Sequence, residues 1–177
     1  MEVESSKIKE LELIIESCEN QCKLLADTIK NQVLEKKDKI INHLEKKELN
    51  SAFSQTTALL KQEEFIKVYD ELSQVINTLK EKCSYIKKSK ECPNDIRASL
   101  DTFIYATKRI KKDEFIKLKE KIKEKFGEDY ITKAENNSDK LVKEIIVNNL
   151  EWKGYTQENI KLRMKQLCKE RKIEFKY

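Results

Sequence analysis

The first 126 residues contain no glycine and a single proline, Pro93. These two residue types supply most of the turns in a polypeptide chain, so their absence leaves few positions where the backbone can reverse. A phosphate-binding loop needs clustered glycines, whereas the two glycines here, Gly127 and Gly154, stand far apart. The composition therefore excludes a glycine-rich nucleotide site and favours long uninterrupted helices.

Histidine is equally scarce, and His43 is the only one in the chain. It stands among lysines and glutamates, with no cysteine, aspartate or serine arranged to support catalysis. Cys18 and Cys22, one helical turn apart, could supply two ligands to a zinc ion, but they lack a second pair. We interpret them as small buried residues with reduced thiols, and we predict neither an enzyme, nor a metal site, nor a cofactor.

Long apolar runs are also missing. No segment approaches the roughly 20 apolar residues that a membrane-spanning helix needs. Residues 1–9 are acidic and lack the apolar region of a signal peptide. These features predict a cytoplasmic protein.

Apolar residues recur at helical spacing along most of the chain. From Ile8 to Ile29 they alternate in steps of three and four, which predicts a first helix over residues 6–47. A second apolar stripe predicts a helix that extends to residue 90, with the reversal between the two at residues 49–51. The pattern therefore predicts an all-α fold based on a long antiparallel helical hairpin.

The remaining residues are expected to form shorter helices that pack on this hairpin. Gly127 is predicted to end one of them, and Thr156 to cap the last one after a turn at residues 152–155. We expect a single domain over residues 1–177. Its parts are a hairpin over residues 6–90, short helices over 94–126 and C-terminal helices over 128–177.

Charge is unevenly distributed, although the net charge is only +5. Residues 1–35 hold 4 lysines and 8 acidic residues, and residues 80–125 hold 15 basic and 8 acidic residues. This asymmetry suits head-to-tail self-association, or contact with an anionic membrane or nucleic acid; a solvated helix face explains it equally well. The basic surface would comprise Lys80, Lys82, Lys87, Lys88, Lys90, Lys108, Arg109, Lys111 and Lys112.

Three segments carry short motifs in the order and spacing of a known family. Residues 96–110, IRASLDTFIYATKRI, resemble a Ser-x-x-x-Leu-Ile-Tyr/Trp-Ala motif, and residues 138–142 resemble a Val-Asn-x-x-Leu helix. In the closing helix, Leu167-Cys168-Lys169 with Ile173 and Phe175 is similar to an Ile-Ala-Lys, Val-Pro-Tyr ending. Together these segments resemble the Ist family, the ESCRT-III-related "increased sodium tolerance" proteins.

The resemblance implies an ESCRT-III-like core and a non-enzymatic scaffold or adaptor in endosomal, multivesicular body sorting and membrane remodelling. Family members bind the charged multivesicular body proteins of ESCRT-III and regulate the vacuolar-sorting AAA ATPase. The protein is thus expected to be cytoplasmic and recruited to endosomal membranes.

The sequence also departs from the family pattern. Residues 52–57 replace an Arg-rich start of the second helix, and Arg163 stands where the family has a tyrosine that faces an ESCRT-III tail peptide. The sequence ends at Tyr177, without the Pro-rich linker and the C-terminal motifs that engage the ATPase. We therefore expect contact with the ATPase to be indirect.

The expected partner site is a groove between the hairpin and the last two helices, which would hold a partner's tail helix. Arg163 and Lys165 are expected to be exposed, whereas Leu141, Ile145 and Leu167 are interpreted first as core residues. The candidate residues are Leu141, Ile145, Ile160, Arg163, Met164, Lys165 and Leu167.

Two alternative functions remain open, namely a basic helical module that binds nucleic acid non-specifically and a coiled-coil tether. Lysine greatly outnumbers arginine, and aromatic residues are rarely interleaved with it, which disfavours readout of bases. No nucleic acid partner is expected.

Overall fold

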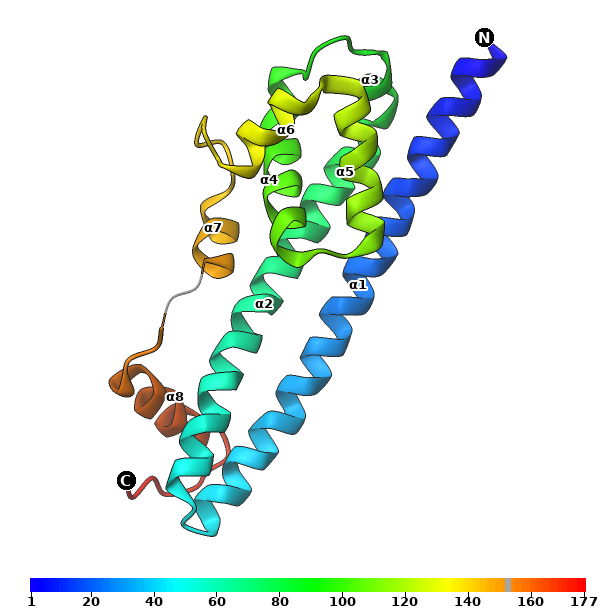
Figure 1. Ribbon diagram of the computed structural model, residues 1–177. Coiled ribbons are helices and arrows are strands. Elements are labelled where there is room, and N and C mark those ends of the chain that lie inside the picture. Colours follow the sequence, from blue (N-terminus) through cyan, green and yellow to red (C-terminus); the bar gives the residue numbers. More distant parts are fainter. Residues whose placement is uncertain (152–153) are drawn as a thin grey trace. The chain divides into compact units, whose positions relative to one another are not determined.

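This computed structural model describes residues 1–151 and 154–177. Within these residues it contains eight helices and no strand (Figure 1). Residues 152 and 153 of the predicted turn lie outside the described residues. The all-α prediction is confirmed. The helices are α1 (Glu2–Glu45), α2 (Leu49–Glu81), α3 (Cys83–Lys88), α4 (Asn94–Ile110), α5 (Asp113–Phe126), α6 (Glu128–Glu135), α7 (Glu144–Leu150) and α8 (Gln157–Glu170).

The chain divides into two compact units, and both α1 and α2 contribute to each of them. Unit 1 consists of Met1–Leu25 and Lys67–Leu150. Unit 2 consists of Ala26–Ile66 and Glu151–Tyr177. Each unit buries its own set of apolar side chains, and both sets include residues of α1 and α2.

Unit 2 is built where α8 packs on the connected ends of α1 and α2. The buried residues fall on one face of each helix, as the spacing of Ile160, Met164 and Leu167 on α8 illustrates, so each helix turns an apolar stripe inward. Ile173 and Phe175, beyond the end of α8, pack against the same core. The core comprises Val33, Ile40, Ile41, Leu44, Ala52, Leu59, Ile160, Met164, Leu167 and Cys168.

The reversal between α1 and α2 lies at Lys46, Lys47 and Glu48, and not at the predicted residues 49–51. Lys47 has a φ of 61°, in the left-handed region. The N–H of Glu48 donates to the carbonyl of His43 at 2.8 Å, and that of Lys47 to the carbonyl of Leu44 at 3.1 Å. This hydrogen-bond pair is a Schellman motif, which ends α1 without a glycine.

Two further helices end in the same way. After α6, Asn137 has a φ of 51° and the N–H of Ser138 donates to the carbonyl of Lys133 at 2.9 Å. After α8, Lys172 has a φ of 56° and the N–H of Ile173 donates to the carbonyl of Cys168 at 2.8 Å. Asparagine and lysine thus occupy positions where glycine is the commonest residue.

Unit 1 contains α4, α5 and α6 packed against one another, with α7 against α4 (Figure 1). Helix α4 is its centre, because every residue from Leu100 to Thr107 is buried. The rings of Phe103 and Phe115 meet edge to face with centroids 5.7 Å apart. The predicted second helix is broken near Lys82, so that α3 forms a separate helix before residue 90.

Candidate partner-binding residues and basic surfaces

Helix α8 carries five of the predicted groove residues, and a capping box defines its start. The Thr156 hydroxyl oxygen accepts from the N–H of Asn159 at 3.1 Å, and the Asn159 side-chain oxygen accepts from the N–H of Thr156 at 3.3 Å. Two otherwise unpaired backbone donors are satisfied in this way. Thr156 is therefore the N-cap, as the sequence predicts.

The inner face of α8 belongs to the core of unit 2. Ile160, Met164 and Leu167 are all buried against α1 and α2. A folded unit 2 therefore does not offer these three side chains to a partner.

Arg163 is an internal clamp, and the expectation that it is exposed is wrong. Its side chain is 11% exposed. The guanidinium donates to both carboxylate oxygens of Glu63 on α2, at 2.8 and 3.0 Å, and to Glu170 at 3.1 Å. These carboxylates raise the pKa of Arg163. The sequence could not indicate the pairing, because Glu63 lies 100 residues away along the chain.

The outer face of α8 presents an apolar residue that sequence reasoning missed. Leu162 is 55% exposed, and Lys165 and Lys169 follow it at helical spacing on the same exposed side. A signal for Leu162 was available, because it lies off the stripe formed by Ile160, Met164 and Leu167. An apolar side chain that faces solvent beside two ammonium groups can contact an amphipathic, acidic helix.

Leu141 and Ile145 lie in unit 1, the first just before α7 and the second on it. Each remains partly accessible, at 37% and 38% exposure, although we interpreted both first as core residues. Lys143 fixes this segment, since its N–H donates to the Thr102 hydroxyl at 3.1 Å and its ammonium contacts Glu71 at 2.6 Å. The structure therefore offers two sets of accessible apolar side chains, one in each unit.

Several members of the predicted basic surface make intramolecular contacts. Lys80 pairs with Glu19 at 3.2 Å, and Lys108 with Glu135 at 3.6 Å. The guanidinium of Arg109 lies 3.4 Å from the centre of the Tyr105 ring and also donates to the carbonyl of Tyr105. Lys111 has a left-handed φ of 55° at the end of α4. Lys87 and Lys88 instead line a pocket in unit 1.

Among the described residues, no group of three or more His, Cys, Asp or Glu side chains is placed to hold a metal ion. In the same part of the chain, no helix combines the length and the apolar character needed to cross a membrane.

The fold places the chain in a known class of helical domain. It is similar to the crystal structure of the S. cerevisiae Ist1 N-terminal domain in complex with the Did2 MIM motif, with a TM-score of 0.84 and 14% sequence identity. The match covers 96% of this chain and 94% of that one. The molecule is thus an ESCRT-III-like helical domain.

A family model also matches residues 13–174, and its description is Ist1, regulator of Vps4 activity in the MVB pathway. The chain belongs to the Ist1 family. Its motifs therefore led to the correct family, and the predicted role in multivesicular body sorting is confirmed at the level of the family. A search of curated protein sequences found no match.

Proposed function

We propose that this protein is a non-enzymatic adaptor that captures the tail helix of an ESCRT-III subunit and thereby modulates the Vps4 ATPase. The observation that carries the proposal is the family match over residues 13–174. The shared fold supports it, because the similar Ist1 domain was crystallised with the Did2 MIM motif. A cytoplasmic location with recruitment to endosomal membranes is part of the same proposal.

Capture of an amphipathic helix requires accessible apolar anchors on rigid supporting elements. Leu162 meets this requirement in unit 2, because the capping box and the Arg163 ion pairs fix the helix that carries it. Lys165 and Lys169 would contact acidic side chains on the partner. In unit 1, Leu141 and Ile145 provide a second pair of anchors on a fixed segment.

The proposal is tested by titrating the protein into a fluorescently labelled tail peptide of an ESCRT-III subunit and measuring anisotropy. We expect saturable binding by the unaltered protein. Leu162→Asp should weaken binding about tenfold or more, since an interface anchor contributes on the order of 1.4 kcal/mol or more. Leu34→Asp is the matched control, because Leu34 is a 57% exposed leucine of α1 in the same unit.

Ile145→Asp tests the anchors of unit 1 in the same assay. If neither Leu162→Asp nor Ile145→Asp changes the affinity, the two proposed surfaces are not the binding site. If the unaltered protein shows no saturable binding to any ESCRT-III tail, the adaptor proposal fails. Retention of duplex DNA at physiological salt without tail binding would favour the nucleic acid alternative.

A further inference from the structure

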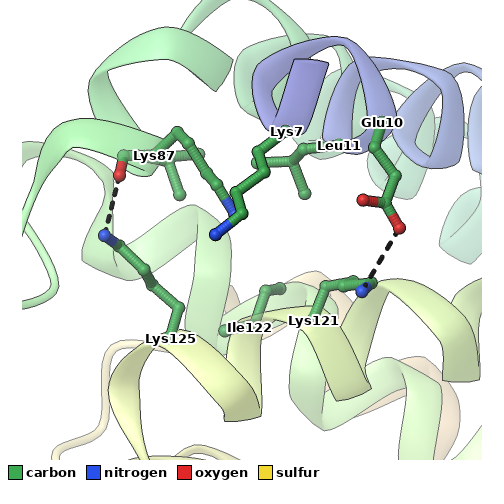
Figure 2. Close-up of a pocket in the computed structure, with 8 residues that line it drawn as sticks. Lys7, Glu10, Leu11, Lys87, Lys121, Ile122 and Lys125 are labelled. Carbon is green, nitrogen blue, oxygen red and sulfur yellow. Dashed lines mark hydrogen bonds and ion pairs between the residues drawn. The ribbon is translucent and has the colours of Figure 1, made fainter. Parts of the chain in front are cut away.

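A pocket in unit 1 gathers lysines from three helices that are distant in sequence. It has a volume of about 420 Å³ and is lined by Glu4, Lys7, Ile8, Lys87, Lys88 and Lys125. A smaller cavity of about 30 Å³ shares three of these lysines and is drawn in Figure 2. We propose that this lysine pocket binds a compact polyanion that carries two or more phosphate groups.

The pocket has an excess of positive charge. Its lining contains four lysines and one carboxylate, that of Glu4, so its formal charge is 4 − 1 = +3. Among the described residues, Lys7, Lys87 and Lys88 form no ion pair. Glu10, at the edge of the smaller cavity, already pairs with Lys121 at 3.3 Å. The ammonium groups of the pocket are therefore available to an external anion.

The lysines also face one another. In Figure 2 the ends of the Lys7 and Lys87 side chains point into the same space. Two like charges held close together repel, and a bound anion between them would turn that repulsion into attraction. The lysines that line this pocket are thus arranged to attract an anion.

Lys125 completes the wall of the pocket. Its ammonium donates to the backbone carbonyl of Lys87 in the last turn of α3, at 2.7 Å (Figure 2). This contact holds the ammonium in place and offsets the partial negative charge of the helix C-terminus, which would otherwise oppose an anion. The ammonium keeps two further N–H donors for a ligand.

An apolar floor lies behind the lysines. Leu11, Ile86 and Ile122 line the smaller cavity and are 7%, 5% and 3% exposed. Ionic interactions are stronger near such a low-dielectric surface than in open water. Lys87 and Lys125 are themselves half-buried, so their aliphatic stems are partly ordered before a ligand arrives.

The dimensions and charge select the class of ligand. A volume of about 420 Å³ is in the range of small-molecule sites and is too small for a partner helix. A single phosphate would leave much of the +3 charge uncompensated, whereas several phosphates on one small scaffold would match it. Lysine binds phosphate as a point charge with three donors. An inositol polyphosphate in solution and a phosphoinositide headgroup in a membrane share this chemistry.

The test uses the full chain and inositol hexakisphosphate, followed by titration calorimetry. We expect saturable binding that weakens as salt is added. The double substitution Lys7→Gln/Lys87→Gln should weaken binding about tenfold or more, because it removes two of the four ammonium groups that line the pocket. The control Lys9→Gln/Lys133→Gln removes the same charge from exposed lysines of unit 1 outside the pocket, and should bind normally.

Sedimentation with vesicles distinguishes the two sources of phosphate. Phosphatidylcholine vesicles that contain a phosphatidylinositol bisphosphate are compared with vesicles of equal charge made with phosphatidylserine. Preferential, pocket-dependent retention on the first identifies a lipid headgroup, whereas binding to the soluble probe alone identifies a free metabolite; either supports the proposal.

Three results would overturn it: no saturable binding, equal loss in the pocket and control variants, or full competition by an acidic peptide of the same charge. The last would assign the pocket to a protein segment. The pocket variants are expected to bind the ESCRT-III tail normally, so this proposal and the proposed function can fail independently.

Discussion

Among single residues, the cysteines show how burial decides the chemistry of a side chain. Cys18 and Cys22 are fully buried, and their thiols donate to the backbone carbonyls of Glu114 and Tyr69 at 3.1 and 3.3 Å. Burial raises the pKa of Cys18 to about 12 and that of Cys83 to about 11. The interpretation of Cys18 and Cys22 as small buried residues is thus confirmed, and their thiols are protonated at neutral pH.

Alkylation of the native protein should therefore discriminate among the five cysteines. We expect Cys92, the only one that is partly exposed, to react first with iodoacetamide, and Cys18 to react slowest. The reactive species is the thiolate, which is both rare and inaccessible at Cys18. Mass spectrometry of timed samples measures the order in which the cysteines are alkylated. In denaturant, where all five thiols are exposed, the differences in rate should disappear. Equal native rates at Cys18 and Cys92 would contradict the buried assignment.

At the scale of elements, lysine replaces glycine where several helices end. Lys47 and Lys172 adopt a left-handed φ inside Schellman motifs, and Lys111 adopts one after α4. The left-handed conformation costs a residue with a side chain roughly 1–2 kcal/mol. Helices therefore end sharply here without glycine, but the positions of these ends cannot be predicted from the sequence, because lysine does not mark a left-handed residue.

Glycine at such a position should stabilise the protein. Lys47→Gly is expected to raise the free energy of unfolding by about 0.5–1 kcal/mol, part of the gain being offset by the greater freedom of glycine in the unfolded chain. The control Lys39→Gly, at an exposed interior position of α1, should lower it by about 1 kcal/mol. Urea unfolding of both variants measures whether each change raises or lowers the free energy of unfolding. A loss of stability in both would show that Lys47 carries no backbone strain.

At the scale of the whole molecule, two units with separate sets of buried residues share the same two long helices. Met164 belongs to the core of unit 2 and is fully buried. Phe103 and Phe115 are in unit 1. A substitution that leaves a cavity in one core is therefore expected to weaken the packing of its own unit more than that of the other.

Met164→Ala should lower the free energy of unfolding by about 2–5 kcal/mol, the usual cost of such a cavity. We expect hydrogen exchange to accelerate more in α8 and in the connected ends of α1 and α2 than in α4. Gln166→Ala, on the exposed side of the same helix, is the control and should change little. Equal acceleration in both units would mean that the chain opens as one cooperative body.

How far the sequence predicted the structure depended on the range of the interactions involved. The first helix was placed within a few residues, and Thr156 was identified as a cap, because periodicity and capping are local signals. The reversal was misplaced because nothing in the sequence marks Lys47 as left-handed. The candidate groove mixed the core residues Ile160, Met164 and Leu167 with accessible ones, since one sequence stripe does not reveal which neighbours cover it.

The sequence by itself determined the all-α class and the family, because these follow from helical period and short motifs. Only the tertiary structure decided that Arg163 is a clamp to Glu63, that Leu162 remains exposed and that Lys7, Lys87 and Lys125 line one pocket. Each of these depends on residues brought together from distant parts of the chain. Such contacts arise from packing between helices, which the local pattern of any one helix does not encode.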